Sequence, residues 1–317
     1  RPRSMAVRIG TDAQGRADRV DYFDAQGAPQ SIEARLVVLA ASALESARLL
    51  LLSESGKWPQ GLGNGNGQVG RNLSFSVFSK VTGVFERGAI VSEYGADGID
   101  EPFLQRSVQD DYWNESLSPI AKGGTYNFIL AHPNPISAAI RLANLARFGM
   151  WGQELRDRIG RYFRQETWAE AEIFGDFLPH VGTYVDLDPR VVDRWGLPVA
   201  RITNTVHPAS VEVAAQMVGR VREVMGSMRP EPLQVLTMAQ GGSTYHLQHG
   251  TCRMGTDPRR SVVDRNCAVH EVQDLYVTDG SFMPNGGGVP ATATIIANAL
   301  RVGAHLADRL RRGEVKR

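Results

Sequence analysis

The sequence predicts a mixed α/β (α+β) fold, and three observations support that prediction. A continuous apolar run at residues 36–40 leads into a small-residue turn and a helix, as in a buried strand of an α/β layer. Several strands separated by helices between residues 75 and 235 indicate an antiparallel sheet flanked by helices. Near the C-terminus, a short strand, a glycine-rich loop and a long helix succeed one another, which favours an anion or cofactor site at the helix N-terminus.

The composition is that of an ordinary globular protein. The 317 residues are 42% hydrophobic and 22% charged, enough for one large or two smaller domains. Lys and Arg number 35 and Asp and Glu 34, so the net charge of +1 suggests neither a nucleic-acid partner nor an acidic membrane surface. The sequence contains no run of about 18 apolar residues, so it predicts no transmembrane helix. Cys252 and Cys267 lack the CxxC spacing of a metal site, and we predict that both are reduced. The sequence is compatible with a cytoplasmic or a periplasmic location.

The N-terminal segment consists of short strand-like runs bounded by turn residues, which predicts a β-meander. The meander leads into Leu-Val-Val-Leu-Ala at residues 36–40, a run predicted to be buried on both faces. The turn Ala41-Ser42-Ala43 leaves room for a cofactor, although such turns are equally common in plain α/β packing. The predicted elements are strands at 5–9, 19–24 and 36–40 and a helix at 44–53.

The sequence signals of residues 75–235 are less specific. Alternation of polar and apolar residues predicts strands there, and apolar residues at helical spacing predict helices. The arginines of the first helical stretch, including Arg141 and Arg158, are interpreted as a solvated helix face. The predicted strands cover 75–85, 125–130, 170–177, 182–187 and 197–202, and the predicted helices cover 135–165 and 210–228.

Two motifs and a strand organise the C-terminal region. Residues 249–255 read His-Gly-Thr-Cys-Arg-Met-Gly, and residues 261–264 read Ser-Val-Val-Asp. Leu275 to Thr278 is a short apolar, β-branched run that predicts a buried strand. Asp279 and Gly280 then predict a turn at the carboxyl end of that strand.

A glycine loop and a helix complete this region. Three consecutive glycines at 286–288 lack Cβ atoms, so the backbone there can pass close to a flat ligand. Pro290 suits the first turn of a helix, where its missing N–H costs nothing. The helix is predicted from about residue 291 to 312, and its apolar face consists of Ile295, Ala299, Val302 and Leu306.

In order and spacing, these pieces resemble the C-terminal signature of the glucose-methanol-choline (GMC) family of FAD-dependent oxidoreductases. Residues 37–50 are similar to a second motif of that family, which usually has Gly at the position of Ser42. The resemblance covers roughly the C-terminal half of a family member. It implies part of a Rossmann-like FAD-binding domain at 1–74, a substrate-binding domain with an antiparallel sheet at 75–240, and the C-terminal part of the FAD-binding domain at 241–317.

The resemblance implies FAD as the cofactor and assigns residues to it. Ala40, Ala41 and Glu45 would lie near the adenosine end, and Asp279 and Gly280 near the ribityl and phosphate groups. The helix N-terminus would face the flavin ring, with Pro290, Ala291 and Thr292 as its residues. Gly65 to Gly70 fit the G-x-G-x-x-G spacing, but no strand precedes them, so we interpret them as a connecting loop. The dinucleotide fingerprint is therefore expected in a further N-terminal segment or on another chain.

Two histidines, His246 and His249, are candidates for the general base. Histidine suits this role because its pKa lies near neutrality. The family's base precedes the motif glycine by three positions, where this chain has Leu247; His246 is one residue away and His249 two. The second active-site group of the family, Asn or His, aligns with Pro290, which can neither donate a hydrogen bond nor take a proton. Asn285 in the same loop is a candidate substitute, although its position favours a turn-forming role.

The resemblance implies oxidation of a CH–OH group of a sugar, polyol or other alcohol by hydride transfer to flavin N5, with a His general base. It favours a dehydrogenase that passes electrons to a quinone or cytochrome over an oxidase. Pro290 and the shifted histidines leave a second hypothesis open, a non-catalytic FAD- or ligand-binding paralogue that pairs with an active subunit.

Overall fold

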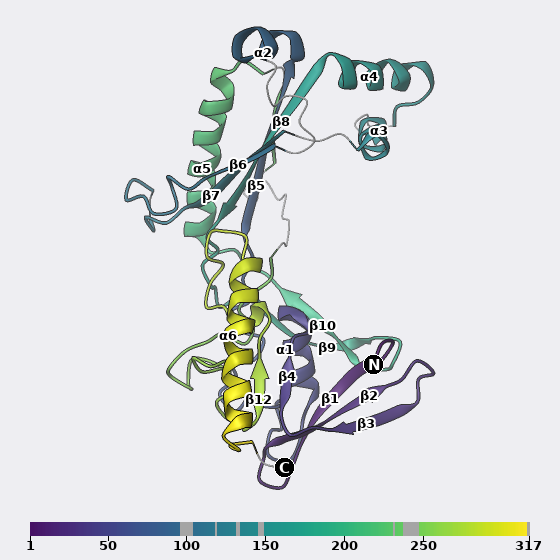
Figure 1. Ribbon diagram of the computed structural model, residues 1–317, viewed down its shortest axis with the longest axis vertical. Helices are drawn as coiled ribbons and strands as arrows, with labels where there is room; N and C mark the ends of the chain where they lie inside the picture. The colour runs from purple at the N-terminus through teal and green to yellow at the C-terminus, as the bar shows by residue number, and fades with distance from the viewer. Residues whose placement is uncertain are drawn as a thin grey trace. The chain divides into compact units, whose positions relative to one another are not determined.

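The computed structural model describes residues 1–95, 104–117, 119–130, 134–144, 149–230, 232–236 and 247–315 (Figure 1). The chain forms two compact units. The first comprises residues 1–76, 176–210 and 245–317, and the second comprises 77–175 and 211–244. Helices and sheets occur in both units, which confirms the predicted mixed fold class. Residues 176–210, which the resemblance assigned to the substrate-binding segment, pack with the first unit.

The first unit begins with the predicted meander. Strands β1 (Met5–Thr11), β2 (Ala17–Phe23) and β3 (Pro29–Glu33) form a three-stranded antiparallel sheet. Strand β3 was not predicted because its sequence lacks the alternation of apolar and polar residues that marks a half-buried strand. All five of its residues are exposed. A hairpin of β9 (Tyr184–Val192) and β10 (Pro198–Thr203) belongs to the same unit.

A parallel pair of strands forms the centre of this unit. Strand β4 (Val37–Leu39) pairs in register with β12 (Leu275–Val277), and each is followed by a helix, α1 (Ser42–Leu52) after β4 and α6 (Thr292–Arg311) after β12 and a loop. The core between them is apolar and contains Leu39, Leu50, Val277, Val302 and Leu306. The helix faces predicted from sequence are thus largely confirmed.

Strand β4 is not buried on both faces, contrary to the prediction. The side chain of Val38 is 41% exposed. Among the described residues, β4 pairs with β12 alone, and Val37 N–H and Leu39 C=O both bond to the β12 segment. In a parallel strand, the backbone N–H and C=O groups of successive residues point to opposite sides of the strand. The N–H and C=O groups of Val38 therefore point away from β12, toward an open edge of the sheet.

The turn after β4 has a strained backbone at Ser42, where the family usually has Gly. Ser42 has φ of 80°, in the left-handed region, where a non-glycine residue costs about 1–2 kcal/mol. We expect Ser42→Gly to raise the free energy of unfolding by roughly 0.5–1 kcal/mol, because the strain relieved exceeds the entropy gained by the unfolded chain. Thermal denaturation tests this, with Ser42→Ala as the control that keeps Cβ and should gain nothing.

The second unit is built on a five-stranded antiparallel sheet (Figure 1). The strand order is β11-β5-β8-β7-β6. Helix α5 (Pro208–Ser227) covers one face, where Met217 and Val221 pack in one cluster with Val81 and Ala171 of the sheet. The strands are β5 (Val77–Glu86), β6 (Leu104–Val108), β7 (Gly124–Leu130), β8 (Glu166–Gly175) and β11 (Leu233–Leu236).

The single helix predicted at 135–165 is two helices, α3 (Pro135–Asn144) and α4 (Gly152–Arg164). A short helix, α2 (Arg87–Tyr94), also belongs to this unit. The arginines predicted to be solvated are partly engaged: Arg158 pairs with the buried Glu166 at 3.0 Å, and Arg141 pairs with Glu170 at 3.3 Å. The prediction failed because a buried carboxylate on the neighbouring strand has no signature in the helix sequence itself.

Over the part of the chain that the structure describes, every helix is too short or too polar to cross a bilayer. Cys252 and Cys267 are both buried, as expected of cysteines in packed structure.

Candidate functional site

The candidate site lies at the carboxyl edge of the parallel pair. Leu39 pairs in register with Val277, so the residues after each strand emerge side by side. Ala40 and Ala41 are exposed after β4, whereas Asp279 is 9% exposed after β12. The carboxyl edge of a parallel sheet is where α/β proteins bind ligands, because helix N-termini and loops gather there.

The motif at 249–255 runs alongside the turn after β12. Cys252 N–H donates to the carbonyl of Ser281 at 2.9 Å, and Met254 N–H donates to that of Phe282 at 2.7 Å. Gly250 has φ of 91°, and a Cβ there would lie 2.1 Å from the Asn72 carbonyl oxygen. Two motifs that are separated in sequence therefore form one backbone layer beside Asp279.

The carboxylate of Asp279 is held by three hydrogen bonds from serines. Ser281 donates to Oδ1 from its backbone N–H at 2.9 Å and from its hydroxyl at 2.6 Å, and Ser46 donates to Oδ2 at 2.5 Å. Ser46 and Ser281 are fully buried. Both were missed from the sequence; the available signal for Ser46 was a polar residue on the otherwise apolar face of α1.

The N-terminal turn of α6 lies beside Gly280. A Cβ on Gly280 would meet Ile295 Cδ1 at 3.1 Å, so the first turn of the helix reaches the turn after β12. Helix α6 begins at Thr292 with Ala291 as its N-cap and no side-chain cap. Pro290 therefore precedes the helix, whereas the sequence predicted it in the first turn. Thr292 and Pro290 are exposed, while Ala291 is 1% exposed.

Gly280 has no room for a side chain, so a larger residue at this position would require the neighbouring backbone to move. A Cβ would lie 2.8 Å from the Gln248 carbonyl oxygen, which belongs to the backbone. We expect Gly280→Ala to lower the free energy of unfolding by about 1–3 kcal/mol, the usual cost of overpacking. Chemical denaturation measures this. Gly303→Ala, in open space within α6, is the matched control and should stabilise by about 0.5–1 kcal/mol.

The glycine loop before α6 is shaped by the chain's own backbone. A Cβ on Gly286 would lie 2.6 Å from the Phe75 carbonyl oxygen, and Gly287 N–H donates to Asp176 Oδ1 at 2.9 Å. The sequence predicted that the backbone of this loop passes close to a ligand. At Gly286 the backbone instead lies close to residues of the same unit. Asn285 is half-buried in this loop.

Glu45 lies on α1, close to the turn at Ala40 and Ala41. Its carboxylate is 48% exposed and pairs with Arg48 at 3.2 Å, so it faces solvent at the same edge. Arg48 is anchored in turn by Asp193 at 2.6 Å and by the Pro198 carbonyl, which ties α1 to the β9–β10 hairpin.

His249 is fully buried next to Gly280. Both ring nitrogens lack a hydrogen-bond partner within the described ranges, and ring atom Cδ2 lies 3.8 Å from the position of a Cβ on Gly280. Burial lowers the pKa of His249 to about 4, because the charged imidazolium is not solvated there. The other candidate base, His246, lies outside the described residues.

Two further buried polar side chains, Ser74 and Ser76, lie on the segment that pairs with His249. Ser74 forms a backbone bridge with His249 through two hydrogen bonds of 3.0 and 2.9 Å, so their side chains share one face. The hydroxyls of Ser74 and Ser76 are fully buried, and among described residues neither has a hydrogen-bond partner. Buried polar groups without partners are rare, so this cluster marks a place where a polar group fits.

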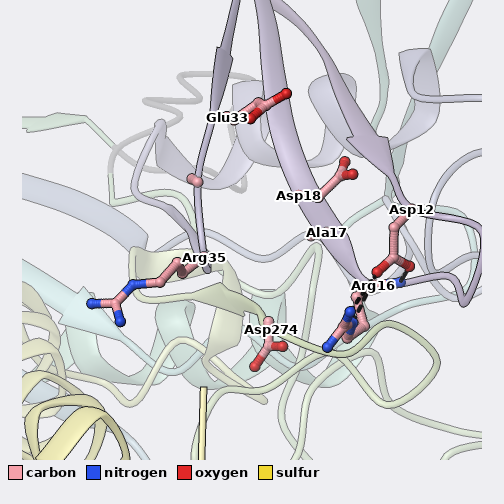
Figure 2. A pocket seen from close by; sticks show the side chains of 8 residues that line it. Asp12, Arg16, Ala17, Asp18, Glu33, Arg35 and Asp274 are labelled. Carbon is pink, nitrogen blue, oxygen red and sulfur yellow. Dashed lines mark hydrogen bonds and ion pairs between the residues drawn. The ribbon is translucent and has the colours of Figure 1, made fainter. Parts of the chain in front are cut away.

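Two cavities of the first unit lie at the opposite edge of the parallel pair. One of about 390 Å³ is lined by acidic and basic side chains near the amino ends of β4 and β12, including Asp274 and Arg35 (Figure 2). A second, of about 460 Å³, shares Arg16 and Asp274 with it. Neither contains a residue predicted from sequence for the cofactor or for catalysis.

Comparison with known proteins agrees with this geometry. Residues 179–299 match the family model described as GMC oxidoreductase. The 2-methyl-1,2-propanediol dehydrogenase of Mycolicibacterium austroafricanum is 30% identical over 304 residues, which are 93% of this chain. This chain belongs to the GMC oxidoreductase family. The 6'''-hydroxyparomomycin C oxidase of Streptomyces lividus is also 30% identical, over 96% of this GMC chain.

Solved structures show the same fold. The formate oxidase of Aspergillus oryzae superposes with a TM-score of 0.63 at 14% identity, over 99% of this chain and 61% of that one. The GMC chain covers 52% of the dehydrogenase and 51% of the paromomycin oxidase, so it spans about half the length of these relatives.

The carboxyl edge fits a large polar cofactor. Exposed small residues at Ala40 and Ala41 leave room for a flat group, and the uncapped N–H groups of α6 suit an anionic one. The buried carboxylate of Asp279 suits a hydroxyl donor.

Proposed function

We propose that the protein containing this chain oxidises a CH–OH group of a sugar, polyol or other alcohol with FAD as the cofactor. The observation that carries the proposal is the meeting of three elements at one edge: the turn after β4, the Asp279-Gly280 turn and the N-terminus of α6. FAD, when bound, accepts a hydride at flavin N5 from the carbinol carbon.

The residues that would hold FAD follow from this edge. Ala40, Ala41 and Glu45 would line the adenosine end, and Asp279 and Gly280 would contact the ribityl and phosphate groups. The first N–H groups of α6, next to Pro290, Ala291 and Thr292, would stabilise negative charge on the pyrimidine side of the flavin. The partial positive charge of a helix N-terminus is typically worth about 0.3–1 kcal/mol to a nearby anion, up to about 2 when partly buried.

We propose His246 as the residue that takes the substrate's hydroxyl proton. General bases work best with a pKa near the operating pH, and burial gives His249 a pKa of about 4. His249 is therefore a weak base at neutral pH in this conformation. Asn285, from the loop before α6, is proposed to donate a hydrogen bond to the substrate in place of the group that Pro290 cannot provide.

The open edge of β4 supports a further strand from outside this chain. Val38 presents an unpaired backbone edge, and α6 exposes Ile296 and Leu300 at 55% and 71%. About half of each relative's length lies outside the match. We propose that a strand and helix of that remaining segment, on this or another chain, pair with β4, cover α6 and bring the pyrophosphate-binding turn.

The reaction is tested by dye reduction with a panel of alcohols, sugars and polyols, with peroxide measured in air. Dye reduction without peroxide supports a dehydrogenase that delivers electrons to a quinone or cytochrome, which we favour. Peroxide formation identifies an oxidase.

A second candidate is a non-catalytic FAD-binding subunit that pairs with an active partner. The specific observation in its favour is Pro290 at the position of the family's second active-site group. Bound flavin without reduction by any alcohol of the panel would support it.

A further inference from the structure

Ser46 links the two turns that form the candidate cofactor site. Its side chain is fully buried on α1. Ala41 N–H donates to its hydroxyl oxygen at 3.2 Å, and the hydroxyl donates to Asp279 Oδ2 at 2.5 Å. One hydroxyl thereby joins the turn after β4 to the turn after β12, although Ser46 and Asp279 are 233 positions apart in sequence.

Asp279 depends on these bonds for its orientation. Ser281 occupies Oδ1 with two donors, and Ser46 is the donor at Oδ2. Within the described part of the chain, no cation pairs with this carboxylate. Rotation of the carboxylate would break these bonds, and hydrogen bonds to an ionised group are about twice as strong as neutral ones. A carboxylate has about four acceptor sites, so about one remains for a ligand hydroxyl.

We infer that Ser46 is a positioning residue of the cofactor site, which acts on bound FAD through Asp279 and the Ala41 amide. This inference rests on the proposed function, because it requires that the edge binds FAD. Because Ser46 is fully buried, it would not touch the cofactor itself. Its role is to keep the free acceptor of Asp279 and the turn at Ala41 in one fixed arrangement before the cofactor arrives, which reduces the ordering cost of binding.

A purely structural role predicts a different result. A buried serine in a helix contributes to stability wherever it has good hydrogen bonds, and Ser53 is such a residue at the other end of α1. Ser53 is 1% exposed, donates to the Leu49 carbonyl at 2.6 Å and accepts from Ile9 N–H at 2.9 Å. It has no contact with Asp279, so Ser53→Ala is a matched control for loss of a buried serine.

The test is a double-mutant cycle read by FAD affinity. FAD is titrated into the apo form of the full polypeptide, and the variants are Ser46→Ala, Asp279→Asn and their combination. We expect Ser46→Ala to raise the Kd for FAD about tenfold in the wild-type background, but less than about twofold in the Asp279→Asn background, since coupled neighbours are non-additive. Ser46→Thr, which keeps the hydroxyl, should stay within about threefold of wild type, and Ser53→Ala should lower the melting temperature without changing the Kd.

The inference is overturned if Ser46→Ala raises the Kd equally in both backgrounds, or lowers only the melting temperature as Ser53→Ala does. Failure of the proposed function looks different, because wild type itself would then bind no FAD. If Ser46→Ala does not fold, Ser46→Cys, with a weaker donor of similar size, takes its place and should give an intermediate increase in Kd.

Discussion

Replacement of His246 with alanine is expected to lower kcat with an alcohol substrate by about 100-fold or more, with flavin content unchanged. Removal of a positioned general base typically costs about 10²–10⁴-fold in rate, because the hydroxyl proton must then leave to water. Steady-state dye reduction, normalised to bound flavin, measures the effect.

His249→Gln is the matched comparison. Glutamine keeps hydrogen-bonding capacity but cannot accept the proton, so a loss of less than about tenfold in kcat is expected if His249 is not the base. The reverse pattern, a large loss in His249→Gln and a small one in His246→Ala, would contradict the assignment. It would mean that cofactor or substrate binding rearranges the surroundings of His249.

The second large effect concerns stability at acidic pH. His249 has a pKa of about 4 in the folded chain and 6.5 as its ordinary value, because burial disfavours the charged ring. The unfolded chain therefore binds a proton between pH 6.5 and pH 4 that the folded chain does not bind. The associated stability is fully present above pH 6.5 and is lost as the pH falls toward 4, by about 3 kcal/mol at pH 4.

Urea unfolding at pH 7, 5 and 4 measures this loss in wild type, His249→Leu and His249→Gln. Neither leucine nor glutamine titrates in this range. Between pH 7 and pH 4, the free energy of unfolding of both variants should therefore fall by about 3 kcal/mol less than that of wild type. Leucine also removes two buried polar atoms that lack partners among the described residues, so it should be near neutral or stabilising at pH 7. Identical pH dependence in wild type and both variants would show that His249 is not a buried neutral imidazole.

The strands and helices near the C-terminus were predictable because their signals are local. The apolar run at 275–277, the Asp-Gly turn and the periodic face with Val302 and Leu306 each depend on a few neighbouring residues. The division into α3 and α4 was not predicted, because apolar residues continue across the break at helical spacing. The exposure of the Val38 side chain depends on what packs over that face of the sheet, a property that the residues of β4 do not encode.

The candidate site was predictable only in part. The structure brings the turns that contain Ala40 and Ala41 and Asp279 and Gly280 to one edge of the parallel pair, and their assignment to FAD stays a proposal. Ser46 and Ser281 were missed, since a serine gives no sign of its partner when that partner is far away in sequence. The burial of His249 was also not apparent, because a histidine in a motif suggests chemistry whether or not the fold leaves it accessible.

The most direct test of the central claim is an anaerobic titration of the purified, flavin-containing polypeptide with an alcohol that supports dye reduction. If the carboxyl edge of β4 and β12 forms an FAD site for CH–OH oxidation, the oxidised-flavin absorption bands should bleach, and Asp279→Asn should weaken retention of the flavin. Absence of flavin from the complete wild-type protein, or bands that persist with every sugar, polyol and alcohol, would contradict the proposed function.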